Sequence, residues 1–225
     1  MNEAAVERQG RTVALDTLRT ARLVGVVRVD DAAAAREIAL AYIRGGISCV
    51  EITMTTPGAA ALISELVDRF RSDPTVLIGA GTVLTADTAR AALDAGARYL
   101  VAPVAPDIAP LAQEYGAATV LGALTPTEIL AALDRGADLV KVFPVSAVGG
   151  PAYFRDIMAP LPTLPLWAAG GTTVAAIRDY LAAGVQVIGL AGCIQPAAAV
   201  RAAEWAAIEN LARQASAECG MRNAE

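Results

Sequence analysis

The chain has 225 residues, a formal net charge of −5 at pH 7 and 55% hydrophobic residues, and it contains no histidine. The lack of histidine excludes Ser-His-Asp and Cys-His catalysis, histidine-ligated metals and a histidine base. Three cysteines without metal-ligand spacing argue against a zinc site and a disulfide framework, so we expect no metal. Without a basic cluster, nucleic acid is not an expected partner.

The apolar residues do not form a membrane segment. No apolar run reaches the roughly 18 to 20 residues that a spanning helix needs, and residues 1–20 carry charges throughout, unlike a secretory signal. We therefore expect a cytoplasmic protein. A single domain over residues 1–225 is consistent with this length, because (β/α) barrels run to about 200 to 250 residues.

Strand and helix signals alternate along the chain after a helical opening from Ala4 to Thr20. Strands are predicted at Leu23–Val29, Ser48–Thr53, Val76–Gly79, Tyr99–Ala102, Ala118–Leu121, Ala137–Pro144, Leu166–Ala169 and Val187–Leu190. Helices are predicted at Ala32–Arg44, from Pro57 to about Arg71, after Thr85, after Pro106, from Pro126 to Arg135, from about Pro151, up to Ala183 and from about Pro196 to Ala215. The tail after about residue 216 is expected to fray.

Eight strand-helix units of short period predict an α/β fold, a closed (β/α)8 TIM barrel with an N-terminal helix. A doubly wound sheet is the alternative. It would favour a Gly-x-Gly-x-x-Gly turn after the first strand, and residues 27–30 do not form one.

The stretch from Ala137 to Pro144 holds Lys141, the only lysine in the chain. Its β-branched and aromatic residues predict a buried strand, where an unpaired ammonium is costly. A buried lysine tends to lose its proton and become a nucleophile, and lysine, unlike arginine, can form a Schiff base. The alternative is that Lys141 lies at a strand end and its amine reaches solvent.

Alternation of side chains along the strands selects residues that face the barrel interior. It places Lys141 and Phe143 inside the sixth strand, Glu51 inside the second, and Arg28 at the inner end of the first. We expect Phe143 to contact the substrate. Because active sites of such barrels lie at the C-terminal ends of the strands, these side chains form the candidate site. A structural ion pair between Glu51 and Lys141 is the alternative.

Five sequence motifs occur in order along the chain: Glu51-Ile-Thr53, Gly79-Ala-Gly-Thr-Val83, Val101-Ala-Pro103, Val140-Lys-Val-Phe-Pro144 and Gly170-Gly171. Together they resemble the 2-keto-3-deoxy-6-phosphogluconate / 4-hydroxy-2-oxoglutarate (KDPG/KHG) aldolase family over about residues 18–200. The resemblance implies a (β/α)8 barrel, a homotrimer and a Schiff-base lysine that works without metal or cofactor.

The resemblance also implies a role for individual residues. Lys141 would form the Schiff base and Glu51 would be the acid and base, while Thr82 and Pro103 would line the substrate site. The phosphate-binding turns would be formed by Gly170, Gly171, Gly192 and Cys193.

The chain departs from the phosphogluconate-type members at three positions. Thr55 replaces the arginine that holds the pyruvate carboxylate, Ala169 replaces a threonine, and Cys193 replaces a serine. The sequences of residues 51–57 and 167–171 are closer to the 2-keto-3-deoxy-6-phosphogalactonate branch. Arg28 with Thr82 is the pair left to hold the carboxylate.

These observations predict a lyase: a class I aldolase that cleaves a 2-keto-3-deoxy-6-phospho sugar acid or 4-hydroxy-2-oxoglutarate to pyruvate and an aldehyde. Two alternatives remain from the residues alone. One is a non-catalytic barrel that binds a phosphorylated ligand. The other is a lysine-imine dehydratase or decarboxylase that acts on keto acids.

Overall fold

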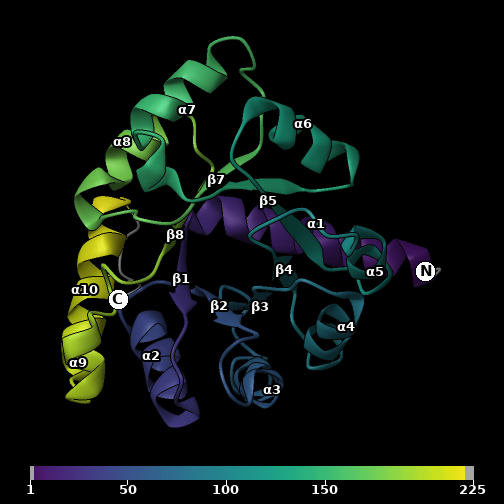
Figure 1. Cartoon of the computed structure of the whole chain (residues 1–225). Coiled ribbons are helices and arrows are strands. Elements are labelled where there is room, and N and C mark those ends of the chain that lie inside the picture. The colour runs from purple at the N-terminus through teal and green to yellow at the C-terminus, as the bar shows by residue number, and fades with distance from the viewer. Residues whose placement is uncertain (1–2, 221–225) are drawn as a thin grey trace.

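The computed structural model describes residues 3–220. Its eight strands are all parallel and form a closed barrel in chain order (Figure 1). They are β1 (Leu23–Val27), β2 (Cys49–Thr53), β3 (Leu77–Gly81), β4 (Tyr99–Val101), β5 (Ala118–Ala123), β6 (Leu139–Val142), β7 (Leu166–Ala168) and β8 (Val187–Leu190). The predicted (β/α)8 TIM barrel is confirmed.

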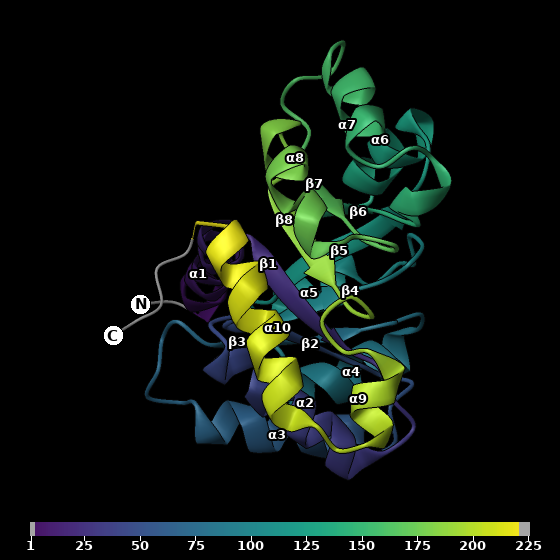
Figure 2. The same cartoon turned by 90° about the vertical axis from the view of Figure 1, so that its left-hand side faces the viewer.

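Helices follow the strands and surround the barrel, as Figure 2 shows from a second side. They are α1 (Glu3–Ala21), α2 (Ala32–Arg44), α3 (Ala59–Arg69), α4 (Ala86–Asp94), α5 (Ala109–Glu114), α6 (Pro126–Asp134), α7 (Pro151–Met158), α8 (Ile177–Ala182), α9 (Ala197–Arg201) and α10 (Trp205–Glu218). Thr85 and Thr125 form capping boxes at α4 and α6, in agreement with the helix starts predicted there.

Buried apolar side chains form two clusters, one on each face of the sheet. The outer cluster lies between the strands and the helices, and it contains Val140 and Val142 of β6. The inner cluster fills the barrel, and it contains Leu139 of β6 and Cys49 of β2. The division confirms the predicted alternation, because it leaves Lys141 on the inner face of β6.

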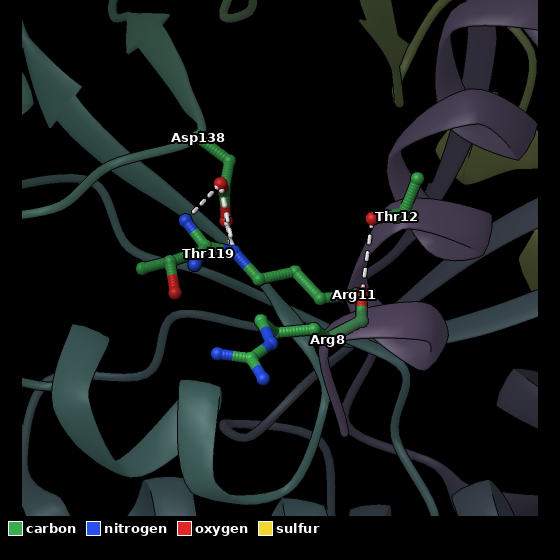
Figure 3. A network of polar contacts seen from close by, with 5 residues as sticks. All are labelled: Arg8, Arg11, Thr12, Thr119 and Asp138. Carbon is green, nitrogen blue, oxygen red and sulfur yellow. Dashed lines mark hydrogen bonds and ion pairs between the residues drawn. The ribbon is translucent and has the colours of Figure 1, made fainter. Parts of the chain in front are cut away.

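Helix α1 covers the N-terminal end of the barrel, where Ala14 and Leu18 join the inner cluster. Nε of Arg11 donates to both carboxylate oxygens of Asp138, at 2.9 and 3.0 Å, just before β6 (Figure 3). The same carboxylate accepts the backbone N–H of Thr119 on β5 at 2.9 Å. This ion pair therefore fixes α1 to β6, which contains Lys141, and to the neighbouring strand β5.

Two predicted helices differ from the structure. The single helix predicted for residues 196–215 is divided into α9 and α10, because Ala203 adopts φ 53°, a left-handed conformation that interrupts the helix. Helix α3 begins at Ala59 rather than at Pro57, after Gly58 with φ 70°.

The C-terminal part of the chain remains helical beyond residue 216, where fraying was predicted to begin. Helix α10 continues to Glu218, and the buried hydroxyl of Ser216 donates to the carbonyl of Gly45 at 3.1 Å. The end of the tail that was predicted to fray, residues 221–225, lies outside the described residues. Within the described part of the chain, no helix has both the length and the apolar character to cross a membrane.

Candidate active site

Lys141 lies in the barrel interior with only 5% of its surface exposed. Its Nζ is 5.5 Å from the centroid of the Phe143 ring, and β6 pairs Lys141 with Gly122 of β5 and with the buried Trp167 of β7. Lys141 is thus a buried residue of the barrel interior, near the C-terminal end of β6. Its amine is a nucleophile that can form a Schiff base with a bound ketone.

Glu51 is completely buried on the inner face of β2. Its side chain lies over strand β3, because a Cβ atom on Gly81 would be only 1.8 Å from Glu51 Oε1. Both carboxylate oxygens are buried without a hydrogen-bond partner. A carboxylate in this state costs stability, which is a common property of groups kept for chemistry.

Glu51 and Lys141 do not form the ion pair that was the structural alternative. Among the described side chains, every ion pair closer than 4.0 Å involves an arginine, and none involves Glu51. The two groups share one interior without neutralising each other. This leaves an amine and a carboxylate available to act on a molecule bound between them.

Arg28 is exposed, one residue beyond the end of β1, so its predicted place inside the barrel is wrong. The strand ends at Val27, and the side chain lies at the C-terminal mouth instead. There Arg28 Nη2 donates to the Thr82 hydroxyl at 3.3 Å. Thr82 has φ 57°, a strained conformation for a β-branched residue, as found at ligand sites.

Pro103 reaches the site through its backbone. A Cβ on Gly122 would lie 2.1 Å from the carbonyl carbon of Pro103, and the N–H of Gly122 donates to the carbonyl of Val104 at 2.8 Å. The loop after β4 therefore crosses over β5 directly beside Lys141, which pairs with Gly122. A larger residue than glycine at position 122 would displace this loop.

The glycine turn after β7 adjoins the lysine strand. Gly170 and Gly171 both have φ 82°, and a Cβ on Gly170 would lie 2.7 Å from the Phe143 ring. Within residues 3–220, the N–H groups of Gly170 and Gly171 donate no hydrogen bond to another backbone group. Free N–H groups of this kind can bind an anion.

The turn after β8 contains Gly192, which is exposed, and Cys193, which is half-buried. Burial raises the pKa of the Cys193 thiol, and the backbone N–H groups of Ala191, Cys193 and Ile194 partly offset this effect. These backbone N–H groups favour negative charge at the turn, as an anion-binding turn would.

The family model for KDPG and KHG aldolase matches residues 15–211. The chain belongs to this family. It is 33% identical to the 2-dehydro-3-deoxy-phosphogluconate aldolase of Pseudomonas aeruginosa, over 91% of this chain and 93% of the relative. It is 36% identical to the probable 2-dehydro-3-deoxy-6-phosphogalactonate aldolase of Rhizobium meliloti, over 75% and 79%.

The structure of this chain is also similar to that of a solved KDPG aldolase from Legionella pneumophila. The two structures have a TM-score of 0.75 and 26% identical residues, and the match covers 95% of this chain and 97% of the other. That enzyme was captured with pyruvate as a covalent carbinolamine intermediate.

The structure of this aldolase-family chain adds three residues that sequence reasoning missed. Tyr99 and Trp167 are fully buried in the inner cluster. Ser146 lies against the glycine turn, because a Cβ on Gly171 would be 2.6 Å from its Oγ. The alternation rule applied to β4 and β7 predicts the first two, whereas the place of Ser146 depends on a loop contact that no sequence pattern encodes.

Proposed function

We propose that this chain is a class I aldolase that cleaves a 2-keto-3-deoxy-6-phospho sugar acid or 4-hydroxy-2-oxoglutarate to pyruvate and an aldehyde. The observation that carries the proposal is the pairing of the only lysine with an unpartnered carboxylate in one barrel interior. Membership of the aldolase family and the fold support it.

In the proposed mechanism, the neutral amine of Lys141 attacks the C2 ketone, and loss of water gives an iminium ion. Glu51 accepts the proton of the C4 hydroxyl, the C3–C4 bond breaks, and its electrons move into the iminium to form an enamine. The aldehyde leaves. Protonation of the enamine at C3 and hydrolysis then release pyruvate and restore the amine. Because the iminium is the electron sink, the proposal includes no metal or cofactor.

The two negatively charged ends of the substrate are assigned to the groups in the site that can bind an anion. Arg28, with the Thr82 hydroxyl beside it, would hold the carboxylate. The backbone amides of Gly170, Gly171, Gly192 and Cys193 would hold a phosphate. Phe143 and Pro103 would form the walls on either side of Lys141.

We also propose that the enzyme is a cytoplasmic homotrimer. Exposed apolar side chains support an interface near the loops after β3 and β4, where Leu84 is 48% and Val104 is 55% exposed. Light scattering should give three times the mass of one chain. Leu84→Asp with Val104→Asp should give smaller species, whereas an unchanged mass would place the interface elsewhere.

The activity is tested by incubating the protein with phosphorylated and unphosphorylated 2-keto-3-deoxy acids and 4-hydroxy-2-oxoglutarate, and measuring pyruvate and aldehyde together. Equal amounts of both products support an aldolase. Carbon dioxide, or a dehydrated acid without aldehyde, would instead indicate a decarboxylase or dehydratase. Binding of a phosphorylated acid without turnover would indicate a non-catalytic barrel.

A further inference from the structure

Three polar groups in the barrel interior have no hydrogen-bond partner: the Glu51 carboxylate, the Tyr99 hydroxyl and the Trp167 indole N–H. All three side chains are fully buried. Buried polar groups are nearly always paired, because a lost hydrogen bond in an apolar setting is costly. One acceptor and two donors in the same interior therefore suggest a functional relation between them.

The Tyr99 side chain extends from β4 toward Glu51. Glu51 pairs with Gly79 of β3, and the next residue of β3, Ala80, pairs with Leu100 of β4, so Tyr99 lies beside Gly79. A Cβ on Gly79 would lie 2.4 Å from both Cε1 and Cζ of Tyr99. The ring thus covers Gly79 and occupies the space between its own strand and that of Glu51.

Trp167 supports the ring of Tyr99 from the other side. Their ring centroids are 6.3 Å apart, with planes inclined by 45°. Trp167 is in turn the register partner of Lys141. The two aromatic rings therefore fill the interior around the pair of groups assigned to the chemistry.

The Tyr99 hydroxyl remains a hydrogen-bond donor at the pH of metabolism. Burial raises its pKa well above the usual value, and the negative charges of Cys49 and Glu51 raise it further. Burial also raises the pKa of the Cys49 thiol to about 12, so the charge that Tyr99 meets at neutral pH is that of Glu51.

The other titratable groups near Glu51 are few. Within the described residues, Lys141 on β6, Tyr99 on β4 and Cys49 on β2 are the titratable side chains on the inner face, and Arg28 lies at the mouth. Lys141 is consumed in the Schiff base, and a thiol is a weak donor.

The Trp167 indole N–H is the other unpartnered donor in the barrel interior, but Nε1 lies beside Gly189 of β8, 2.9 Å from where a Cβ would be. Tyr99 covers Gly79, the register partner of Glu51, and is therefore the donor better placed to serve the carboxylate.

We propose that Tyr99 is a positioning residue for Glu51: the Tyr99 hydroxyl donates a hydrogen bond to a water molecule that in turn donates to the Glu51 carboxylate. This contact aims the carboxylate at the substrate, ready to accept the C4 hydroxyl proton. The inference rests on the proposed function, since it assigns Glu51 the role of the base.

Tyr99→Phe removes one oxygen atom, and Tyr180→Phe is the matched control. Tyr180 is also a buried tyrosine, but it lies on α8, where its ring packs against Phe154 in the outer cluster. We expect kcat of Tyr99→Phe to fall about tenfold or more with little change in KM. The acid limb of its kcat–pH profile should move up by about one pH unit, because the carboxylate loses a donor. Tyr180→Phe should keep the profile of the wild type.

Infrared spectroscopy separates this inference from the proposed function. The carboxyl band that disappears in Glu51→Gln belongs to Glu51, and the pH at which it loses its proton is measured without substrate. This pH should rise in Tyr99→Phe, and an unchanged pH together with an unchanged kcat would overturn the inference. Absence of aldolase activity in the wild type would overturn the proposed function alone, since the infrared titration still decides the role of Tyr99.

A second perturbation covers the case in which Tyr99→Phe does not fold. Replacement of all tyrosines by 3-fluorotyrosine makes the phenol a stronger hydrogen-bond donor and leaves the shape nearly unchanged. The Glu51 band should then titrate at lower pH than in the wild type, the opposite direction to Tyr99→Phe. An unchanged titration would overturn the inference.

Discussion

At the scale of single residues, the proposed chemistry depends on groups that are left unpaired. Lys141 has an aromatic ring at 5.5 Å and no ion pair in the described structure, and Glu51 has two oxygens without partners. Either group would lose reactivity if it were neutralised by a neighbour. In the proposed mechanism, the substrate interacts with both groups, and Tyr99 supports the carboxylate.

Arg28→Met tests which end of the substrate Arg28 holds. A charged hydrogen bond to a carboxylate contributes about 1.5–3 kcal/mol, so its loss should weaken pyruvate binding by about one to two orders of magnitude. Pyruvate trapping by borohydride and turnover of a phosphorylated substrate are measured together, with Arg36→Met on the outer surface as control. Normal trapping with a defect only for the longer substrate would assign Arg28 to the distal end.

Cys49 makes the stability of the fold dependent on pH. Its pKa is about 12 in the folded protein, against about 8.5 in an unfolded chain. Below about pH 8 both states keep the proton, and above it only the unfolded state releases it, so the free energy of unfolding should fall as pH rises. The Cys49 contribution lost at pH 9.5 is about 1.4 kcal/mol. Urea unfolding should show a shallower decline for Cys49→Ala, and equal slopes would contradict this assignment.

At the scale of the elements, strand β3 provides space rather than side chains. Gly79 admits the ring of Tyr99, and Gly81 admits the Glu51 side chain. Strand β3 pairs with β2 on one side and with β4 on the other, and side chains of these two neighbours fill the volume that its glycines leave open. The position of the carboxylate is thus determined by the absence of a Cβ on its neighbour.

Gly81→Ala should displace Glu51, because the new Cβ would lie 1.8 Å from Oε1. We expect kcat to fall by about 100-fold, as for loss of a general base, while circular dichroism shows the native fold. Gly10→Ala on α1 is the control, since its closest contact is the flexible end of Arg98. Full activity in Gly81→Ala would mean that Glu51 does not need its observed position.

Helix α1 should depend on its ion pair with the barrel. In Asp138→Asn the bonds from Arg11 lose their charge, and the free energy of unfolding should fall by about 1–3 kcal/mol. The exposed pair of Arg71 and Asp68 is the comparison, and Asp68→Asn should change stability by less than about 0.5 kcal/mol. Equal effects in urea unfolding would show that α1 is held by apolar packing alone.

Local chemistry explains which elements the sequence predicts well. Thr85 and Thr125 cap their helices through neighbouring residues. Alternation along β6 places Lys141 inside because Val140 and Val142 on either side of it face the helices. The break at Ala203 has no Gly or Pro signal, so it depends on how α10 packs. Arg28 was misplaced because β1 ends two residues earlier than its apolar run. Boundaries of this kind are determined by tertiary contacts, which a sequence pattern does not contain.

At the scale of the whole molecule, closure of the barrel brings together residues from distant parts of the chain. Glu51 comes from β2, Tyr99 from β4, Lys141 from β6 and the glycine turn from the end of β7. Pairing of β1 with β8 completes the ring (Figure 1). We propose that the chain forms a single domain, since the inner cluster contains residues from all eight strands.

Borohydride reduction in the presence of pyruvate tests the central claim, that Lys141 is the Schiff-base residue. The wild type should gain one three-carbon unit on the peptide that contains Leu139 to Phe143, identified by mass spectrometry. Lys141→Arg keeps the positive charge but cannot form an imine, and no other lysine exists in the chain, so side-chain labelling should disappear. Side-chain labelling that persists in this variant, or a wild type that is not labelled, would contradict the account.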